Sequence, residues 1–83
     1  MSRKLKVAAI QMDVAPAPVP VRLERAYGLV REAAGQGAEL VVLPEVFNTG
    51  YAYTNANYEN AERFEDGTTV QWMKRTAAEF NIH

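Results

Sequence analysis

Glu45 is the residue best placed for chemistry, because it follows the apolar run Leu40–Leu43 after one intervening residue, Pro44. The run is short and rich in β-branched residues, which is typical of a parallel strand buried on both faces. Pro44 cannot donate to a sheet ladder, so it ends the strand and leaves Glu45 at the carboxyl end. Ligands of open α/β sheets bind outside these strand ends. A carboxylate held there can serve as a general base or a metal ligand, and the structural alternative is a solvated loop glutamate.

Few other side chains in the sequence are suited to catalysis. The chain has no cysteine, and its one histidine, His83, is the last residue. Because chain ends are usually frayed, we expect the His83 side chain to be a poor base or metal ligand. Gln11 could approach the same crevice as Glu45, but a buried amide that ties down neighbouring backbone is the favoured interpretation. Asp13–Pro16 stands where a glycine-rich phosphate loop would follow the first strand, so a nucleotide-binding unit is a weak alternative.

The elements that position Glu45 follow from the apolar periodicity. Leu5–Met12 is the expected first strand, and Val21–Ala34 repeats apolar residues at helical spacing, with Arg22 and the other charged residues pointing elsewhere. Gly35 and Gly37 are stop signals for this helix. Strand, helix and strand then form a right-handed βαβ unit, so we expect the two strands to be parallel neighbours.

A second helix is expected over Thr69–Phe80. Thr68, followed by Gln71 three positions later, matches a capping box at its start. Apolar residues at helical spacing define its buried face, with Trp72 off that face. Before it, residues 47–67 are rich in aromatic and amide side chains. They form either a long loop packed by its own aromatic rings or one wall of a substrate pocket.

Composition narrows the possible partners. The chain has 83 residues, enough for one small domain at most, with nine basic and ten acidic residues. This balance gives no electrostatic case for nucleic-acid binding. No apolar stretch approaches the ~20 residues of a membrane span, and no signal-peptide core follows the amino terminus. We therefore predict a soluble, cytoplasmic protein, without a cofactor, a metal site or a membrane partner.

Two stretches resemble the opening of the carbon–nitrogen hydrolase (nitrilase) superfamily: Lys6–Met12 and Gly37–Tyr51, which contains Leu-Pro-Glu followed by Thr-Gly-Tyr. The resemblance extends over roughly Lys4 to His83. It implies an α/β fold in which this chain supplies the first βαβα portion of a four-layer α-β-β-α sandwich. Residues 1–83 are then the amino-terminal part of a single, incomplete domain.

The resemblance also implies a reaction. Members of this superfamily hydrolyse a non-peptide carbon–nitrogen bond, in an amide, N-carbamoyl compound or nitrile, with a cysteine nucleophile, a glutamate general base and a lysine that stabilises the oxyanion. Glu45 matches the glutamate, and Phe47 and Tyr51 are implied as substrate contacts. The lysine and the cysteine lie downstream of the matched region. Arg22 departs from the family, in which many members have asparagine at that position.

These implications leave two hypotheses. The first is an enzyme fragment that is inactive alone and forms a homo-oligomer when complete. The alternative is a non-catalytic interaction module, or a pseudogene product, that pairs with a full-length relative by adding its strands. In both cases the sheet has open edges and one uncovered face, so we expect the isolated chain to fold poorly or to associate.

Overall fold

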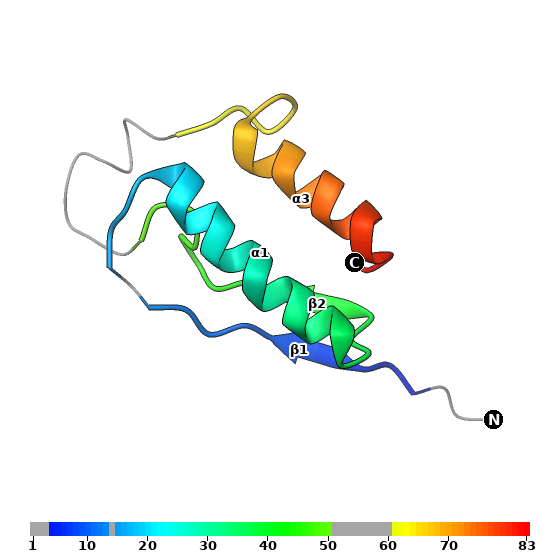
Figure 1. The fold of residues 1–83 in the computed structure, drawn as a ribbon. Coiled ribbons are helices and arrows are strands. Elements are labelled where there is room, and N and C mark those ends of the chain that lie inside the picture. The colour runs from blue at the N-terminus through cyan, green and yellow to red at the C-terminus, as the bar shows by residue number, and fades with distance from the viewer. Residues whose placement is uncertain (1–3, 14, 51–60) are drawn as a thin grey trace.

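The computed structural model describes residues 4–13, 15–50 and 61–83. It contains two strands and two helices in the order β1 (Val7–Ala9), α1 (Val19–Gly35), β2 (Leu40–Val42) and α3 (Thr68–Phe80) (Figure 1). The order of elements confirms the prediction. Both helices begin slightly before the expected residues, whereas the first strand is shorter than predicted.

The two strands form a parallel sheet, as predicted. Val7 pairs with Leu40, and Ala9 pairs with Val42. The ladder continues beyond β1, where the Ile10 N–H donates to the Val42 carbonyl at 2.9 Å. A right-handed crossover through α1 is the usual way to join two such strands. The carboxyl ends of β1 and β2 therefore lie at the same edge of the sheet.

The carboxyl terminus also joins this sheet. The His83 N–H donates to the Glu39 carbonyl at 2.9 Å, and the Val41 N–H donates to the His83 carbonyl at 2.9 Å. Two such bonds around one residue are the pattern of a parallel pair. The expectation of a frayed His83 is wrong, because Asn81 takes a left-handed conformation with φ 54° at the end of α3 and turns the chain back toward β2.

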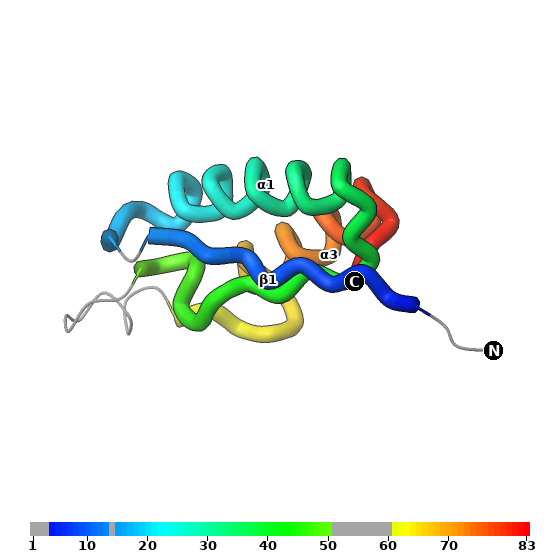
Figure 2. The backbone as a smooth tube through the Cα atoms, turned by 90° about the horizontal axis from the view of Figure 1, so that it is seen from below, coloured from blue at the N-terminus to red at the C-terminus, as the bar shows by residue number. Residues whose placement is uncertain are grey.

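The helices leave one face of the sheet open. α3 runs beside α1 (Figure 1), and no helix of the described residues covers the opposite side of the two strands (Figure 2). Val7 and Val42 are each 51% exposed, whereas Val41 faces Val30 of α1. The prediction of a strand buried on both faces is therefore wrong for Val42, since no second layer of the described residues covers it.

α1 follows its predicted periodicity on most of its buried face. It starts without a side-chain cap, with Pro18 at the N-cap position and Pro20 in the first turn, where the missing N–H does no harm. Leu23, Ala26 and Val30 are buried at helical spacing. The helix ends where predicted, and Gly37 takes a φ of 92° that a residue with a Cβ rarely adopts.

The hydrophobic core lies at the carboxyl end of the strands. Leu23 and Ala26 from α1 pack with Phe47, which follows β2. Trp72 of α3 packs against this cluster, with its ring centroid 5.8 Å from that of Phe47. The prediction that Trp72 lies off the buried face is wrong, because α3 presents Thr69, Trp72 and Thr76 to the rest of the molecule.

The helices of the described residues are too short or too polar to cross a bilayer.

Candidate active site

Glu45 lies where the sequence predicts, directly after β2 and Pro44 at the carboxyl edge of the sheet. Its side chain is exposed. The residue opens a tight turn over residues 45–49, which the N–H groups of Thr49 and Gly50 close by donating to the Val46 carbonyl at 3.2 and 2.9 Å. A strand, a proline and a closed turn thus fix the direction of the backbone that carries the carboxylate.

Val46, the residue after Glu45, has an unusual backbone. Its φ is 49°, in the left-handed region that β-branched residues rarely enter. Such a conformation costs roughly 1–3 kcal/mol and persists only where surrounding contacts enforce it. The turn around Glu45 is therefore held in place by its neighbours rather than by local preference.

Arg22 provides the most extensive of these contacts. Its Nε donates to the Phe47 carbonyl at 2.9 Å, while its Nη1 donates to the carbonyls of Asp13 at 2.8 Å and Ala15 at 3.2 Å. The same Nη1 also contacts Asp13 Oδ1 at 3.1 Å. Arg22 therefore joins the loop after β1 to the turn after β2, and the charge is compensated by a carboxylate and three carbonyl oxygens.

The prediction that Arg22 points away from the buried face of α1 is wrong. The side chain is 2% exposed and is the largest fully buried side chain of the described residues. A signal was present, because Arg22, Ala26 and Val30 are successive residues four apart, on one stripe of the helix. Charge alone suggested exposure, but acceptors from two loops make the buried position favourable.

The two loops at this edge also touch directly. Gly50 has a φ of 85°, and a Cβ built on it would lie 2.7 Å from Pro16 Cα and 2.8 Å from the Ala15 carbonyl oxygen. Only glycine fits such an approach without a shift of the backbone. Gln11, on the same edge, is exposed, so the expectation of a buried amide is wrong here, whereas Met12 packs on the core.

A second hydrogen-bonded group holds the turn from the α3 side. Asn48 Nδ2 donates to Thr69 Oγ1 at 3.1 Å, and that hydroxyl donates to Glu62 Oε2 at 2.6 Å. Glu62 Oε1 also accepts from the Thr69 N–H at 2.6 Å. The hydrogen bonds from Thr69 lower the pKa of the Glu62 carboxyl, and Asn48 lowers it by a smaller amount.

This arrangement replaces the predicted capping box. Thr68 makes no capping hydrogen bond at the start of α3, and Gln71 Nε2 instead donates to the Glu65 carbonyl at 3.0 Å. Glu62 takes the capping role from outside the helix, where a carboxylate is favoured by the positive end of the helix dipole.

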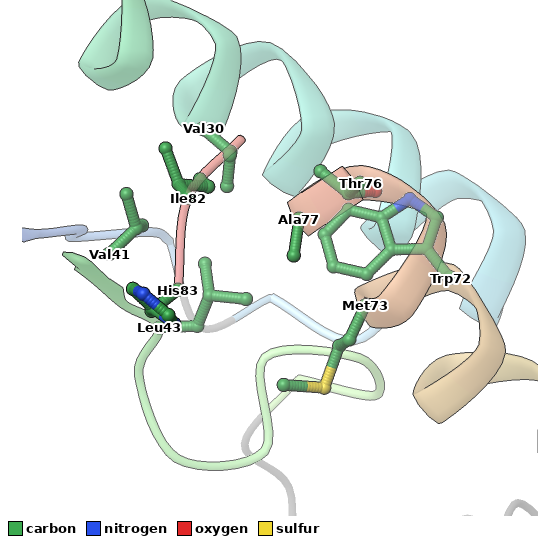
Figure 3. Close-up of a pocket in the computed structure, with 9 residues that line it drawn as sticks. All are labelled: Val30, Val41, Leu43, Trp72, Met73, Thr76, Ala77, Ile82 and His83. Atoms are coloured by element: carbon green, nitrogen blue, oxygen red, sulfur yellow. The ribbon is translucent and has the colours of Figure 1, made fainter. Parts of the chain in front are cut away.

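Glu45 is not among the residues that line the pocket in Figure 3. The pocket holds about 60 Å³ between α1, β2, α3 and the carboxyl terminus, and its walls are mostly apolar. Nine residues line it: Val30, Val41, Leu43, Trp72, Met73, Thr76, Ala77, Ile82 and His83. This space is an unfilled part of the core, and it offers no convergent polar groups for a substrate. The described residues also contain no group of acidic, histidine or cysteine side chains that could hold a metal.

Comparison with known proteins decides the family. Residues 6–83 match the family model of carbon–nitrogen hydrolases. The chain belongs to the carbon–nitrogen hydrolase family. The parallel strand pair with its two helices is consistent with the amino-terminal portion of a nitrilase fold.

Individual carbon–nitrogen hydrolases match over nearly the whole chain. An omega-amidase from Danio rerio is 41% identical over 80 residues, which cover 96% of this chain and 28% of the relative. A nitrilase from Pyrococcus abyssi is 33% identical over 81 residues, which cover 95% of this chain and 31% of the relative. A 2-oxoglutaramate amidase from Bacillus subtilis is 31% identical over 81 residues, which cover 96% of this chain and 30% of the relative. The chain thus spans less than a third of the length of these hydrolases.

The remaining family-implied residues stay predictions. Phe47 is buried, and its ring packs against Leu23, Ala26 and Trp72, so packing accounts for its position without a substrate. Tyr51 lies outside the described residues. Glu45 is exposed at the edge where Arg22 and the turn hold it, and its role as the general base stays a prediction.

Proposed function

We propose that this chain forms the amino-terminal part of a carbon–nitrogen hydrolase domain in which Glu45 is the general base. The observation that carries the proposal is the position of Glu45 directly after β2, within a segment that matches the family throughout. The names of the relatives, omega-amidase, 2-oxoglutaramate amidase and nitrilase, favour a small-molecule amide or nitrile as substrate, with an N-carbamoyl compound as a further option.

In this mechanism Glu45 accepts and donates protons. Its carboxylate accepts the proton of a cysteine thiol from the downstream part of the domain, and the thiolate attacks the carbonyl or nitrile carbon. A downstream lysine stabilises the negative charge that develops on the substrate. With an amide, the protonated Glu45 gives its proton to the leaving nitrogen, and the carboxylate then activates the water that hydrolyses the acyl-enzyme. With a nitrile, the nitrogen takes the proton as a thioimidate, and a first water must add to the carbon before ammonia leaves and a second water hydrolyses the acyl-enzyme.

The same mechanism makes the isolated chain inactive. The sequence contains no cysteine, and loss of a nucleophile costs several orders of magnitude in rate. We also propose that the complete protein is a homo-oligomer.

One observation favours the alternative of an interaction module. Leu5, just before β1, and Val7 and Val42 of the strand pair are each about half exposed, and no second layer of the described residues covers them. Exposed apolar surface of this kind marks an interaction site or a surface that a further layer covers. A module that pairs with a full-length relative would use this surface without any role for Glu45.

The test uses a complete domain, defined here as this chain followed by the downstream part of the Danio rerio omega-amidase. The amidase itself is the reference for folding, and ammonia release from an ω-amide measures activity. The proposal predicts turnover by the complete domain and none by the isolated chain. A folded complete domain without turnover would contradict the proposal and favour the interaction module.

A further inference from the structure

Arg22 is the one fully buried charged side chain in the described residues, and all of its hydrogen bonds are made at the edge that carries Glu45. We infer that Arg22 is a positioning residue, which holds the turn after β2 so that Glu45 keeps a fixed direction toward the reacting atoms. The inference rests on the proposed role of Glu45 as the general base.

The link from Arg22 to Glu45 is short. Arg22 Nε bonds the carbonyl of Phe47, two residues beyond Glu45, at 2.9 Å. The residue between them is Val46, whose left-handed backbone is strained. If Val46 relaxed to an ordinary conformation, the Phe47 carbonyl would turn away from Arg22, and the backbone that carries Glu45 would move. The hydrogen bond therefore opposes the relaxation directly.

Arg22 is itself firmly held. It lies in the first turns of α1, and its Nη1 bonds two carbonyls of the loop after β1, at 2.8 and 3.2 Å. Binding these acceptors and the Phe47 carbonyl together requires the forked guanidinium, which presents several donors in one plane. Arg25 does not replace it, since its one ion pair among the described residues is with Asp13 Oδ1, at 3.6 Å, and its side chain is 45% exposed.

The far side of the turn has independent support. Asn48 is bonded to Thr69, which Glu62 holds at the start of α3, and the Phe47 ring is buried in the core. Loss of the Arg22 contacts should therefore loosen the part of the turn next to Glu45 without unfolding the whole segment. This predicts an effect on the rate of the chemical step rather than on substrate binding.

The experiment compares Arg22→Lys, Arg22→Met and the control Arg25→Met in the complete domain. A displacement of the base by about 1 Å can cost a factor of about 10², so we expect kcat to fall about tenfold for Arg22→Lys and about a hundredfold for Arg22→Met, with KM little changed. Arg25→Met should keep the rate of the parent domain. Thermal melting of each variant separates loss of rate from loss of fold.

A double-mutant cycle identifies how Arg22 acts. If it works through Glu45, Arg22→Lys should change the residual rate of Glu45→Gln by less than about twofold. Adding Val46→Gly, which removes the strain of the left-handed residue, should return part of the rate to Arg22→Lys.

Three results would overturn the inference: equal losses from Arg22→Lys in both backgrounds, a change in KM alone, or unfolding of both Arg22 variants. Failure of the proposed function would give a different result. If Glu45 is not the general base, Glu45→Gln should keep the parent rate, both with Arg22 and with lysine at position 22.

Discussion

Three glycines allow the energetic cost of backbone conformation to be separated from the cost of close packing, and one of them, Gly50, lies at the edge that carries Glu45. Gly28 lies within α1 with no atom of another residue near a built Cβ, so alanine there should stabilise the domain by about 0.5–1 kcal/mol. Gly37 has a φ of 92° but only the flexible end of Lys6 nearby, at 3.7 Å. Alanine at Gly37 should therefore cost roughly 1–2 kcal/mol, the cost of a left-handed residue.

Gly50 combines both effects. Its φ is 85°, and a Cβ would meet Pro16 Cα at 2.7 Å and the Ala15 carbonyl oxygen at 2.8 Å, which are backbone atoms that cannot move aside alone. Overpacking of this kind adds roughly 1–3 kcal/mol to the backbone cost, so Gly50→Ala should lose roughly 2–5 kcal/mol. The assay is denaturant unfolding of the complete domain, with the m-value checked for constancy.

The order of the three values is the critical result. Gly50→Ala should be the least stable, Gly37→Ala intermediate and Gly28→Ala the most stable. Equal losses for the Gly50 and Gly37 variants would mean that the loops after β1 and β2 do not touch as described. The account of how this edge is assembled would then be wrong.

Two further predictions concern the support of the turn. The hydrogen bonds from Thr69 lower the pKa of the Glu62 carboxyl in the folded protein. The stabilisation that this carboxylate gives is therefore complete above the pKa of an unfolded glutamate, about 4.3. It is lost as the pH falls through the lowered pKa of the folded protein. Glu62→Gln should therefore lower the melting temperature at neutral pH and flatten the acid limb below about pH 4, and an unchanged acid limb would argue against this role. Phe47→Ala should cost about 3–5 kcal/mol in unfolding free energy, because it empties the core beside Leu23 and Trp72, and a loss below about 1 kcal/mol would show that Phe47 is not a core residue.

The elements of the fold could be predicted because their signals are local. An apolar run of strand length and a helical repeat of Leu23, Ala26 and Val30 suffice to give the βαβ order and the parallel pairing. Pro44 after the run is enough to place Glu45 at the carboxyl edge of β2. These inferences need only neighbouring residues, and they agree with the structure.

The supporting contacts could not be predicted because their partners are distant in sequence. The acceptors of Arg22 lie 9 residues before it, at Asp13, and 25 residues after it, at Phe47. Glu62 caps α3 from 7 residues before Thr69, and it displaces the local capping box that the sequence suggested. Such partners come together only in the folded chain. The sequence alone therefore does not show whether a charged residue on a helix is buried, or which group caps a helix that starts at a threonine.

Single-turnover acylation of Glu45→Gln in the complete domain tests the central claim most directly. Glutamine keeps the shape of the side chain but cannot accept the thiol proton, so we expect acylation to slow by about 10²–10⁴ while the melting temperature stays nearly unchanged. Glu39→Gln, at an exposed glutamate just before β2, is the matched control and should acylate at the parent rate. Acylation by the Glu45→Gln variant at the parent rate would contradict the assignment and make Glu45 a solvated loop residue.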